Sequence, residues 1–244
     1  MAKTILITGG AGGICSELCR ALASDGLNVA VADFDIAAAE KLAAEICNAK
    51  GGAIAVQVDV GDAKSVAAMI ERTVAEFGQI DVLLCGAGVM DRVPVVEMPE
   101  AMWDRLMRIN LKGVFLCPQA AARHMIPRNA GRMLNIASGR GIVGQARAAH
   151  YAASKAAVIA YSKSLADELA PHNIAVNCIC PGAVDTPLAR AGVTDAQFRP
   201  KHDIPPMLNG LTQKFEVVGL VRYLLSDAAQ YVTGQNFFLR TAKY

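Results

Sequence analysis

The sequence predicts one α/β domain over residues 1–244, built on a doubly wound parallel sheet of about seven strands with helices on both faces. Short apolar runs alternate with amphipathic stretches from one end of the chain to the other, and no linker or repeat separates them. This alternation is typical of a parallel sheet whose strands are joined by helices. The composition agrees, because 53% of the residues are hydrophobic and only 5% are aromatic, which suits close packing of helices on a sheet.

The expected strands are apolar runs at residues 3–8, 28–33, 53–58, 80–84, 132–136, 174–179 and 236–239. Helical periodicity lies between them, at residues 14–24, 35–49, 62–76, 99–125, 149–170 and 214–226. Each helix then makes a right-handed crossover between two parallel strands. Asp62 is the expected N-cap of the third helix, and Gly78 is its expected C-terminal stop.

Residues 187–211 break this alternation. Their apolar periodicity is weak, and they carry Pro200, Pro205, Pro206, Gly192 and Gly210. Irregular connections of this length in compact domains are usually functional. We therefore expect a mobile substrate lid with one short helix; the alternative is a surface excursion with no role.

The charge balance argues against polyanionic partners. The 24 basic and 22 acidic residues are scattered along the chain and give a net charge of +2, so we expect no nucleic-acid partner. No run approaches the roughly 20 apolar residues of a membrane helix, so no membrane partner is expected. The sequence also lacks the Gly-x-x-x-x-Gly-Lys-Ser/Thr motif, which excludes the usual phosphate-binding loop of nucleoside-triphosphate hydrolases.

The cysteines predict neither a disulfide framework nor a metal site. Their number, 7, is odd, and no Cys-x-x-Cys pair occurs, so buried reduced thiols are expected. The first residues combine one lysine with a short apolar run that ends at glycines, and we expect no export signal there. These features predict a cytoplasmic chain without a metal.

A glycine-rich turn, residues 8–15, follows the first strand and leads into a helix. Glycines at such a turn allow a pyrophosphate to approach the backbone, and the helix N-terminus stabilises its charge. Gly9, Gly13 and Ile14 are the expected cofactor contacts in this turn.

The end of the second strand indicates which dinucleotide binds. Asp33 lies 20 residues after Gly13, where a carboxylate accepts hydrogen bonds from an adenosine ribose. Asp33, Phe34 and Asp35 carry no positive charge, and a 2′-phosphate would meet like charge there. We therefore expect NAD(H) rather than NADP(H), with Asp33 and Phe34 beside the adenosine.

Tyr151 and Lys155 are the candidate acid/base pair. They lie four residues apart within a predicted helix, so they share one face of it. A nearby ammonium group lowers the pKa of a phenol from about 10 toward working pH and makes it a competent general acid or base. Ser138 follows the fifth strand, at the edge where open α/β sheets bind ligands.

Together these motifs resemble the short-chain dehydrogenase/reductase family, which is NAD(P)-dependent, Rossmann-like and of the Tyr-x-x-x-Lys type. The matching features run from Thr8 to Gln235, nearly the whole chain, in an order and spacing that are highly specific. They are Thr8 with Gly9 and Gly13, Asp59 with Val60, Ala87 with Gly88, Asn110 within 109–113, Ser138, Tyr151 with Lys155, Pro181 with Gly182, and residues 231–235.

The resemblance implies a role for each matching residue. Tyr151 exchanges a proton with the substrate oxygen, and Ser138 orients that oxygen by a hydrogen bond. Lys155 binds the nicotinamide ribose and lowers the tyrosine pKa, while Asn110 supports a water in the proton relay. The further cofactor contacts that it implies are Asp59 and Val60 at the adenine, Ala87 and Gly88 at the ribose, and Pro181, Gly182, Val184 and Thr186 at the nicotinamide amide. A homo-oligomer, either a tetramer or a dimer, is also expected.

Three places depart from the family pattern. The last glycine of the turn is Cys15 here, and the family's Asn-Asn-Ala-Gly segment begins with Cys85 and Gly86. A thiol at residue 15 takes room where helix, strand and cofactor pack. Loss of the two amides removes groups that join the central strands. Residues 238–244 replace the usual family ending, in a region commonly used for subunit contacts.

The substrate-facing loops suggest an anionic ligand. They carry Arg92, Arg140, Gln145, Arg147 and His150, and the lid adds Arg190, Arg199 and Lys201. Paired arginine donors bind carboxylates, phosphates or sulfonates; the alternative is that these arginines are simply solvated. Ser138, Arg140, Gln145 and Tyr151 are the expected substrate contacts, Arg140 being the best anion candidate because it follows Ser138 closely. His150 is expected to be structural.

Three functions follow. The leading hypothesis is an oxidoreductase that interconverts a secondary alcohol and a ketone with NAD(H), acting on a sugar, a polyol or a small anionic hydroxy compound. A second is a 3-oxoacyl thioester reductase, against which Asp33 argues because such reductases commonly prefer NADPH. The third hypothesis, from another functional class, is a non-catalytic NAD-sensing binding protein. The intact Ser138, Tyr151 and Lys155 disfavour it.

Overall fold

The computed structural model describes residues 2–191 and 212–239. Seven parallel strands form one sheet in the order β3-β2-β1-β4-β5-β6-β7. The strands are β1 (Thr4–Thr8), β2 (Asn28–Asp33), β3 (Gly52–Gln57), β4 (Val82–Cys85), β5 (Gly131–Ile136), β6 (Ile174–Pro181) and β7 (Asn236–Leu239). The direction of winding reverses between β1 and β4, and the predicted doubly wound sheet is confirmed.

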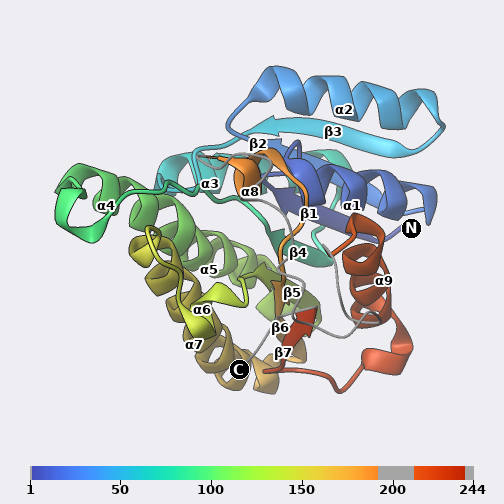
Figure 1. Ribbon diagram of the computed structural model, residues 1–244. Coiled ribbons are helices and arrows are strands. Elements are labelled where there is room, and N and C mark those ends of the chain that lie inside the picture. Colours follow the sequence, from blue (N-terminus) through green and yellow to red (C-terminus); the bar gives the residue numbers. More distant parts are fainter. Residues whose placement is uncertain (1, 192–211, 240–244) are drawn as a thin grey trace.

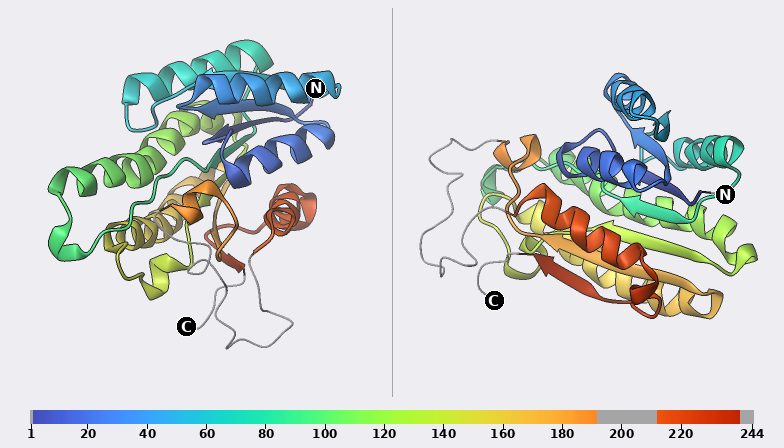
Figure 2. Two further views of the ribbon diagram at one scale, coloured as in Figure 1. Left: turned by 45° about the horizontal axis from the view of Figure 1, so that its top comes forward. Right: turned by 90° about the vertical axis from the view of Figure 1, so that its right-hand side faces the viewer.

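Helices cover both faces of the sheet (Figures 1 and 2). One apolar core joins the sheet to α1 (Gly13–Ser24), α2 (Ile36–Asn48) and α9 (Lys214–Leu225). The other core lies under α3 (Ala63–Phe77), α5 (Gly113–Met125) and α7 (Ala149–Leu169). The shorter helices are α4 (Glu100–Met107), α6 (Arg140–Val143) and α8 (Pro187–Arg190), with single turns at η1 (Val95–Glu97), η2 (Arg108–Lys112), η3 (Ile126–Arg128), η4 (Ala170–His172) and η5 (Asp227–Ala229).

The central strands are apolar throughout because helices cover them on both sides. Every residue of β1 and of β4 is buried, which explains why these strands appear in the sequence as continuous apolar runs rather than alternating ones. Their carboxyl ends lie together with those of β5 and β6 at one edge of the sheet. The loops that leave this edge carry the candidate site.

The long helix expected over residues 99–125 is the main correction to the predicted elements. It is divided into α4 and α5 by the π-helical turn η2. A π-turn inserts one extra residue into a helix, and here it leaves Asn110 fully buried. The predicted ends of α3 are confirmed, because Asp62 accepts hydrogen bonds from two backbone N–H groups and Gly78 adopts a φ of +82°.

Part of the predicted lid lies outside the described residues. Its first four residues form α8, whereas residues 192–211 are not described.

The cysteines form no disulfide bonds, as expected, because all seven are free thiols. Every one except Cys47 is buried. Within residues 2–191 and 212–239 we find no cluster of three or more metal-binding side chains and no helix that is long and apolar enough to cross a membrane.

Candidate active site

The glycine turn between β1 and α1 contacts two other segments of the site. Gly9 has a φ of +64°, and a β-carbon there would lie 2.7 Å from the Ala87 Cα. A β-carbon on Gly13 would lie 2.6 Å from the Thr186 Cγ2. The Thr8 Oγ1 accepts a hydrogen bond from the Ala87 N–H at 3.4 Å. The turn, the loop after β4 and the segment after β6 therefore meet, as cofactor binding requires of them.

The N-terminus of α1 fits an anionic group. Its N-cap residue, Gly12, provides no side-chain cap, and the first turn contains no acidic residue. A β-carbon on Gly12 would meet only the Gly9 carbonyl oxygen, at 3.1 Å, so this side of the turn is open. Open N–H groups at a helix N-terminus are a binding site for phosphate. The residues present therefore fit the pyrophosphate of a dinucleotide.

Asp33 lies against the same turn. Its Oδ2 accepts a hydrogen bond from the Ala11 N–H at 3.0 Å, and its Oδ1 accepts one from the Asp35 N–H at 3.1 Å. These two bonds fix the carboxylate beside the start of α1. The neighbouring Phe34 side chain is 73% exposed, so a flat apolar face is open next to Asp33.

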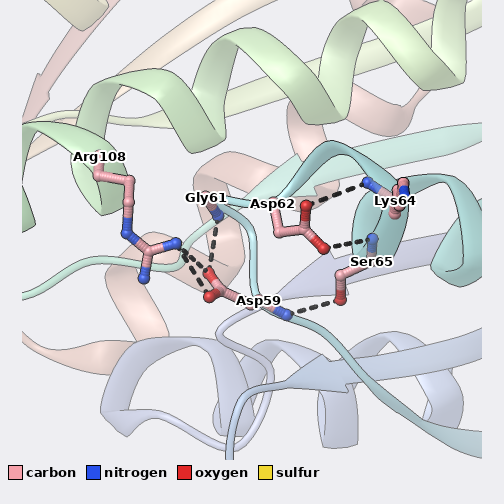
Figure 3. A network of polar contacts seen from close by, with 6 residues as sticks. All are labelled: Asp59, Gly61, Asp62, Lys64, Ser65 and Arg108. Carbon is pink, nitrogen blue, oxygen red and sulfur yellow. Dashed lines mark hydrogen bonds and ion pairs between the residues drawn. The ribbon is translucent and has the colours of Figure 1, made fainter.

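On the expected adenine side, Asp59 is the centre of a polar network (Figure 3). Its carboxylate accepts hydrogen bonds from the Arg108 Nη1, at 2.9 and 3.0 Å, and from the Gly61 N–H at 2.9 Å. Its own N–H donates to the Ser65 Oγ at 2.9 Å. Sequence reasoning did not identify Arg108, which lies on the π-turn and is far from Asp59 in the chain.

Val60, the other residue expected at the adenine, packs against Gly113. A β-carbon on Gly113 would lie 2.7 Å from the Val60 side chain.

Tyr151 and Lys155 lie on α7 and are both buried, with exposed fractions of 7% and 5%. The Lys155 Nζ lies 5.8 Å from the centre of the Tyr151 ring, which confirms that the two share a helix face. The same Nζ donates a hydrogen bond to the Ile136 carbonyl oxygen at 2.8 Å. Ser138, two residues beyond β5, is 9% exposed and interacts with the Tyr151 phenol by a hydrogen bond. The predicted catalytic side chains therefore lie together.

The electrostatics of Tyr151 differ from the expectation. Burial raises the pKa of its phenol, and the hydrogen bond from Ser138 and the charges of Arg92 and Arg140 act in the opposite direction. The charges that lower the phenol pKa are thus those of the two arginines rather than that of Lys155, to which the sequence assigned this role. Burial lowers the pKa of the Lys155 ammonium to about 8, against the opposing effect of nearby thiols.

Asn110 has a positioning role in this structure. Its amide pairs with the backbone of Val89: Oδ1 accepts from the N–H at 2.8 Å, and Nδ2 donates to the carbonyl at 2.9 Å. Nδ2 also lies 3.3 Å from the Ser154 Oγ on α7. A β-carbon on Gly88 would lie 3.3 Å from the Asn110 Oδ1. Asn110 therefore fixes the loop after β4 against the catalytic helix.

The predicted nicotinamide segment follows β6. The Pro181 carbonyl accepts a hydrogen bond from the Gly139 N–H at 3.4 Å, which joins this segment to the Ser138 loop. Gly182 donates its N–H to the Leu239 carbonyl oxygen at 2.7 Å. Val184 is buried, and the Thr186 Oγ1 caps α8 by accepting from a backbone N–H. This segment therefore borders both the glycine turn and Ser138.

The two departures in the cofactor half occupy adjacent space. A β-carbon on Gly86 would collide with the Cys15 Sγ, so the thiol fills the volume that a side chain at residue 86 would occupy. The atoms that β-carbons on Gly9, Gly12 and Gly13 would meet belong to residues other than Cys15. Burial raises the pKa of the Cys15 thiol to about 12. The room that Cys15 takes is available because residue 86 has no side chain.

A thiol also stands where the family has the first of its two amides. Cys85 is buried at the end of β4, and a hydrogen bond with Cys117 and its burial raise the pKa of its thiol. The carboxyl end of β4 is still joined to β1, since the Gly86 N–H donates to the Thr8 carbonyl at 3.1 Å. The expected loss of ties between the central strands is therefore partial.

The substrate-side residues fall into three groups. Arg140 is exposed at the start of α6, and Gln145 is half-buried in the next loop, where its side chain makes no hydrogen bond to any described residue. His150 is fully buried, and within the described part of the chain neither of its ring nitrogens has a partner. Arg190 forms an ion pair with Asp185 at 2.5 Å, while residues 199 and 201 lie outside the described residues.

Comparisons with known proteins agree with this geometry. The short chain dehydrogenase family matches residues 3–197. The chain is 36% identical over 245 residues to the 3-oxoacyl-[acyl-carrier-protein] reductase FabG of Staphylococcus aureus (strain Mu50), covering 100% of this chain and 99% of that protein. It is 37% identical over 233 residues to the cis-4-hydroxycyclohexanecarboxylate dehydrogenase of Sinomonas cyclohexanicum, covering 95% and 92% of the two chains.

Solved structures give the same result. A 3-ketoacyl-(acyl-carrier-protein) reductase from Brucella melitensis, complexed with NADH, superposes with a TM-score of 0.89 at 30% identity, covering 97% of this chain and 96% of the other. Levodione reductase superposes with a TM-score of 0.90 at 27% identity, covering 97% and 95%. The family match and the full-length relatives identify the chain as a member of the short-chain dehydrogenase/reductase family of oxidoreductases.

Proposed function

We propose that this chain interconverts a secondary alcohol and a ketone by hydride transfer with NAD(H). One observation carries the proposal: Tyr151, Lys155 and Ser138 lie together at the carboxyl edge of the sheet, next to a turn in which β-carbons on Gly9 and Gly13 would collide with neighbouring segments. A buried phenol beside a hydroxyl and a cation is suited to proton exchange with a substrate oxygen. The turn is suited to the pyrophosphate of the cofactor.

The mechanism assigns one task to each side chain. In ketone reduction the Tyr151 phenol donates its proton to the carbonyl oxygen, and in alcohol oxidation the phenolate accepts it back. Ser138 donates a hydrogen bond to the same oxygen and so stabilises the charge that develops there. Lys155 binds the cofactor ribose, and Asn110 fixes the loop after β4. When bound, NAD(H) supplies or accepts the hydride.

The preference for NAD(H) rests on Asp33. Its carboxylate is fixed beside the start of α1 by the N–H groups of Ala11 and Asp35. A ribose hydroxyl donates a hydrogen bond to a carboxylate, whereas a 2′-phosphate is repelled by it. The other proposed cofactor contacts are Gly9, Gly13, Ile14, Phe34, Asp59, Val60, Ala87, Gly88, Pro181, Gly182, Val184 and Thr186.

Two substrate classes have support from relatives. A 3-oxoacyl thioester is supported by the names of the Staphylococcus and Brucella reductases, and more of the relatives named above point to it than to a sugar or polyol. The expectation that Asp33 argues against this substrate loses its force, because the Brucella reductase was crystallised with NADH. A small hydroxy acid is supported by the Sinomonas dehydrogenase.

The test is a hydride-transfer assay that follows NADH absorbance with acetoacetyl-CoA, 4-oxocyclohexanecarboxylate and a ketose. Tyr151→Phe is expected to lower turnover of the accepted ketone by about 10²- to 10⁴-fold, because it removes the proton donor, while NADH still binds. Tyr223→Phe is the matched control, since Tyr223 is 43% exposed on α9. Unchanged turnover in Tyr151→Phe would remove the proposed acid. NADH binding without turnover of any ketone would favour the NAD-sensing alternative.

Two further predictions accompany this function. We expect a cytoplasmic protein that assembles as a homo-tetramer or dimer. Sedimentation of the purified chain tests the assembly.

A further inference from the structure

We propose that Arg92 and Arg140 together form an anion-binding site on the substrate side of the cleft, and that the physiological substrate is a small keto acid whose carboxylate binds there. The inference rests on the proposed function, which it extends by naming the class of substrate. It selects one of the two substrate classes and adds Arg92 as a specificity-determining residue.

The position of Arg92 is fixed by the substrate-side backbone. Its Nε donates a hydrogen bond to the Ala191 carbonyl at 3.0 Å, and its Nη2 donates to the Ala189 carbonyl at 3.3 Å. The next residue, Val93, donates its N–H to the Arg147 carbonyl at 2.7 Å. The guanidinium therefore spans from the loop after β4 to the end of α8. A guanidinium has five N–H donors, so these two bonds leave three for a ligand.

Arg140 approaches from the opposite loop. Its backbone N–H donates to the Ser138 Oγ at 3.2 Å, which places the residue directly beside the catalytic hydroxyl. Gly141 fixes α6 on the catalytic helix, because a β-carbon there would lie 2.7 Å from the backbone of Lys155 and Ala156. The Arg140 side chain itself is exposed and makes no hydrogen bond or ion pair with any described residue.

Nearby carboxylates do not neutralise either arginine. Asp91, adjacent to Arg92 in the chain, pairs instead with Arg105 at 2.9 Å. Asp185, before α8, pairs with Arg190 at 2.5 Å. Within the part of the chain that the structure describes, neither Arg92 nor Arg140 has an acidic partner. The charge of this pair is therefore available to a ligand.

The two guanidinium groups act on each other and on the same phenol. Burial lowers the pKa of the Arg92 guanidinium, and the charge of Arg140 lowers it further. Both charges also lower the pKa of Tyr151, against the effect of its burial. Two positive charges beside the same phenol repel each other, and an anion bound between them lowers this repulsion. The backbone bond from Arg140 to the Ser138 Oγ places one arginine of the pair beside the hydroxyl that holds the same substrate oxygen.

The planar fork of each guanidinium matches a carboxylate in particular. A keto acid with few atoms between its carboxylate and its carbonyl group fits a site in which one arginine follows Ser138 closely and the other lies on the loop after β4. A thioester is neutral at the corresponding place, and its binding would leave a half-buried arginine without a counter-charge. The geometry therefore favours the acid over the thioester.

Binding of an unreactive probe tests the site without chemistry. Cyclohexanecarboxylate and its neutral amide, cyclohexanecarboxamide, are titrated by calorimetry into the NAD⁺-loaded protein. We expect the carboxylate to bind at least about 10-fold more tightly than the amide, since hydrogen bonds to charged groups are the strong ones. Arg140→Gln should abolish this preference, and Arg140→Lys should restore part of it.

Controls separate binding from folding. Arg123→Gln removes an exposed arginine on α5 that has no bonded partner among the described residues, and it should leave the preference intact. Arg92→Gln should also lose the preference, but it additionally breaks the bonds to α8, so Arg140→Gln, which breaks no side-chain bond in the described structure, is the decisive variant. Equal binding of acid and amide, or a preference that Arg140→Gln leaves unchanged, would overturn the proposal.

Turnover distinguishes this proposal from the proposed function. With NADH, 4-oxocyclohexanecarboxylate should be reduced with a kcat/KM at least about 10-fold above that of its amide, and the two arginine variants should lose this ratio. If no ketone is reduced but the acid still binds selectively, the proposed function fails and the anion site stands. If acetoacetyl-CoA is the better substrate and Arg140→Gln has no effect on the acid, the anion site fails and the oxidoreductase stands.

Discussion

The two sides of the cleft are built by different kinds of contact. On the cofactor side, glycines allow a close approach: Gly9 lies against the Ala87 backbone, and Gly13 lies against the Thr186 side chain. On the substrate side, a long side chain spans the gap between loops, as Arg92 does when it reaches the end of α8. Contacts of the first kind depend on the absence of a side chain, and those of the second depend on where a flexible side chain ends. The cofactor side should therefore respond to volume and the substrate side to charge.

Gly9→Ala is expected to have the largest effect of the changes on the cofactor side. The new β-carbon meets the Ala87 backbone, and the φ of +64° is unfavourable for any side chain. We expect the free energy of unfolding to fall by about 3 kcal/mol, together with loss of NADH binding. Gly219→Ala is the control, because Gly219 lies in α9 with nothing within 4 Å of the new carbon; it should stabilise by about 0.5–1 kcal/mol. Equal effects of the two changes would contradict the packing argument.

A second test concerns the paired departures at Cys15 and Gly86. Gly86→Ala alone should destabilise by about 1–3 kcal/mol, because its β-carbon meets the Cys15 thiol. Adding Cys15→Ala removes that sulfur, so the double variant should recover stability, with a coupling energy of about 0.5–3 kcal/mol in urea unfolding. Cys19→Ala, on the same helix but bonded to the Gly10 carbonyl, should show no coupling to Gly86→Ala. Additive effects of Cys15→Ala and Gly86→Ala would mean that the two sites are independent.

Asp33→Asn extends the comparison to charge on the cofactor side. The amide keeps an acceptor for the Ala11 N–H but removes the negative charge. We expect the ratio of kcat/KM for NADH over NADPH to fall by about 10-fold, which corresponds to a change of about 1.4 kcal/mol in discrimination. Asp35→Asn, which keeps the N-cap acceptor of α2, should change the ratio less. A ratio unaffected by Asp33→Asn would reject this basis for cofactor choice.

The smallest expected effect is on the pH dependence of alcohol oxidation. The phenolate of Tyr151 is the active form in this direction, so the rate rises with pH through the phenol pKa. Arg140 lowers that pKa; its removal raises it, and Arg140→Gln should therefore move the rising limb to higher pH with a neutral alcohol. Arg123→Gln should leave the profile in place. A shift to lower pH would contradict the sign of this interaction.

The sequence predicted the fold, and it selected candidate site residues that the structure brings together, because the determinants of both are local. A glycine turn after a buried strand and a Tyr-x-x-x-Lys spacing on a helix follow from the chain order alone. The π-turn at Arg108–Lys112 was missed, because 99–125 reads as one unbroken helical pattern. The Arg108–Asp59 pair joins residues 49 positions apart and has no local signal. The electrostatics of Tyr151 depend on Arg92 and Arg140, whose approach from two loops is a property of the tertiary structure.

Because the Cys15 thiol occupies the space beside Gly86, the substitutions at these two positions are more easily accepted in one order than in the other. In a chain with asparagine at 86, the β-carbon of that side chain would meet a thiol at 15. Replacement of the asparagine by glycine leaves a small void, which a later thiol fills. The reverse order passes through an overpacked intermediate beside the cofactor turn. Evolution of this active site is therefore expected to be directional at these two positions.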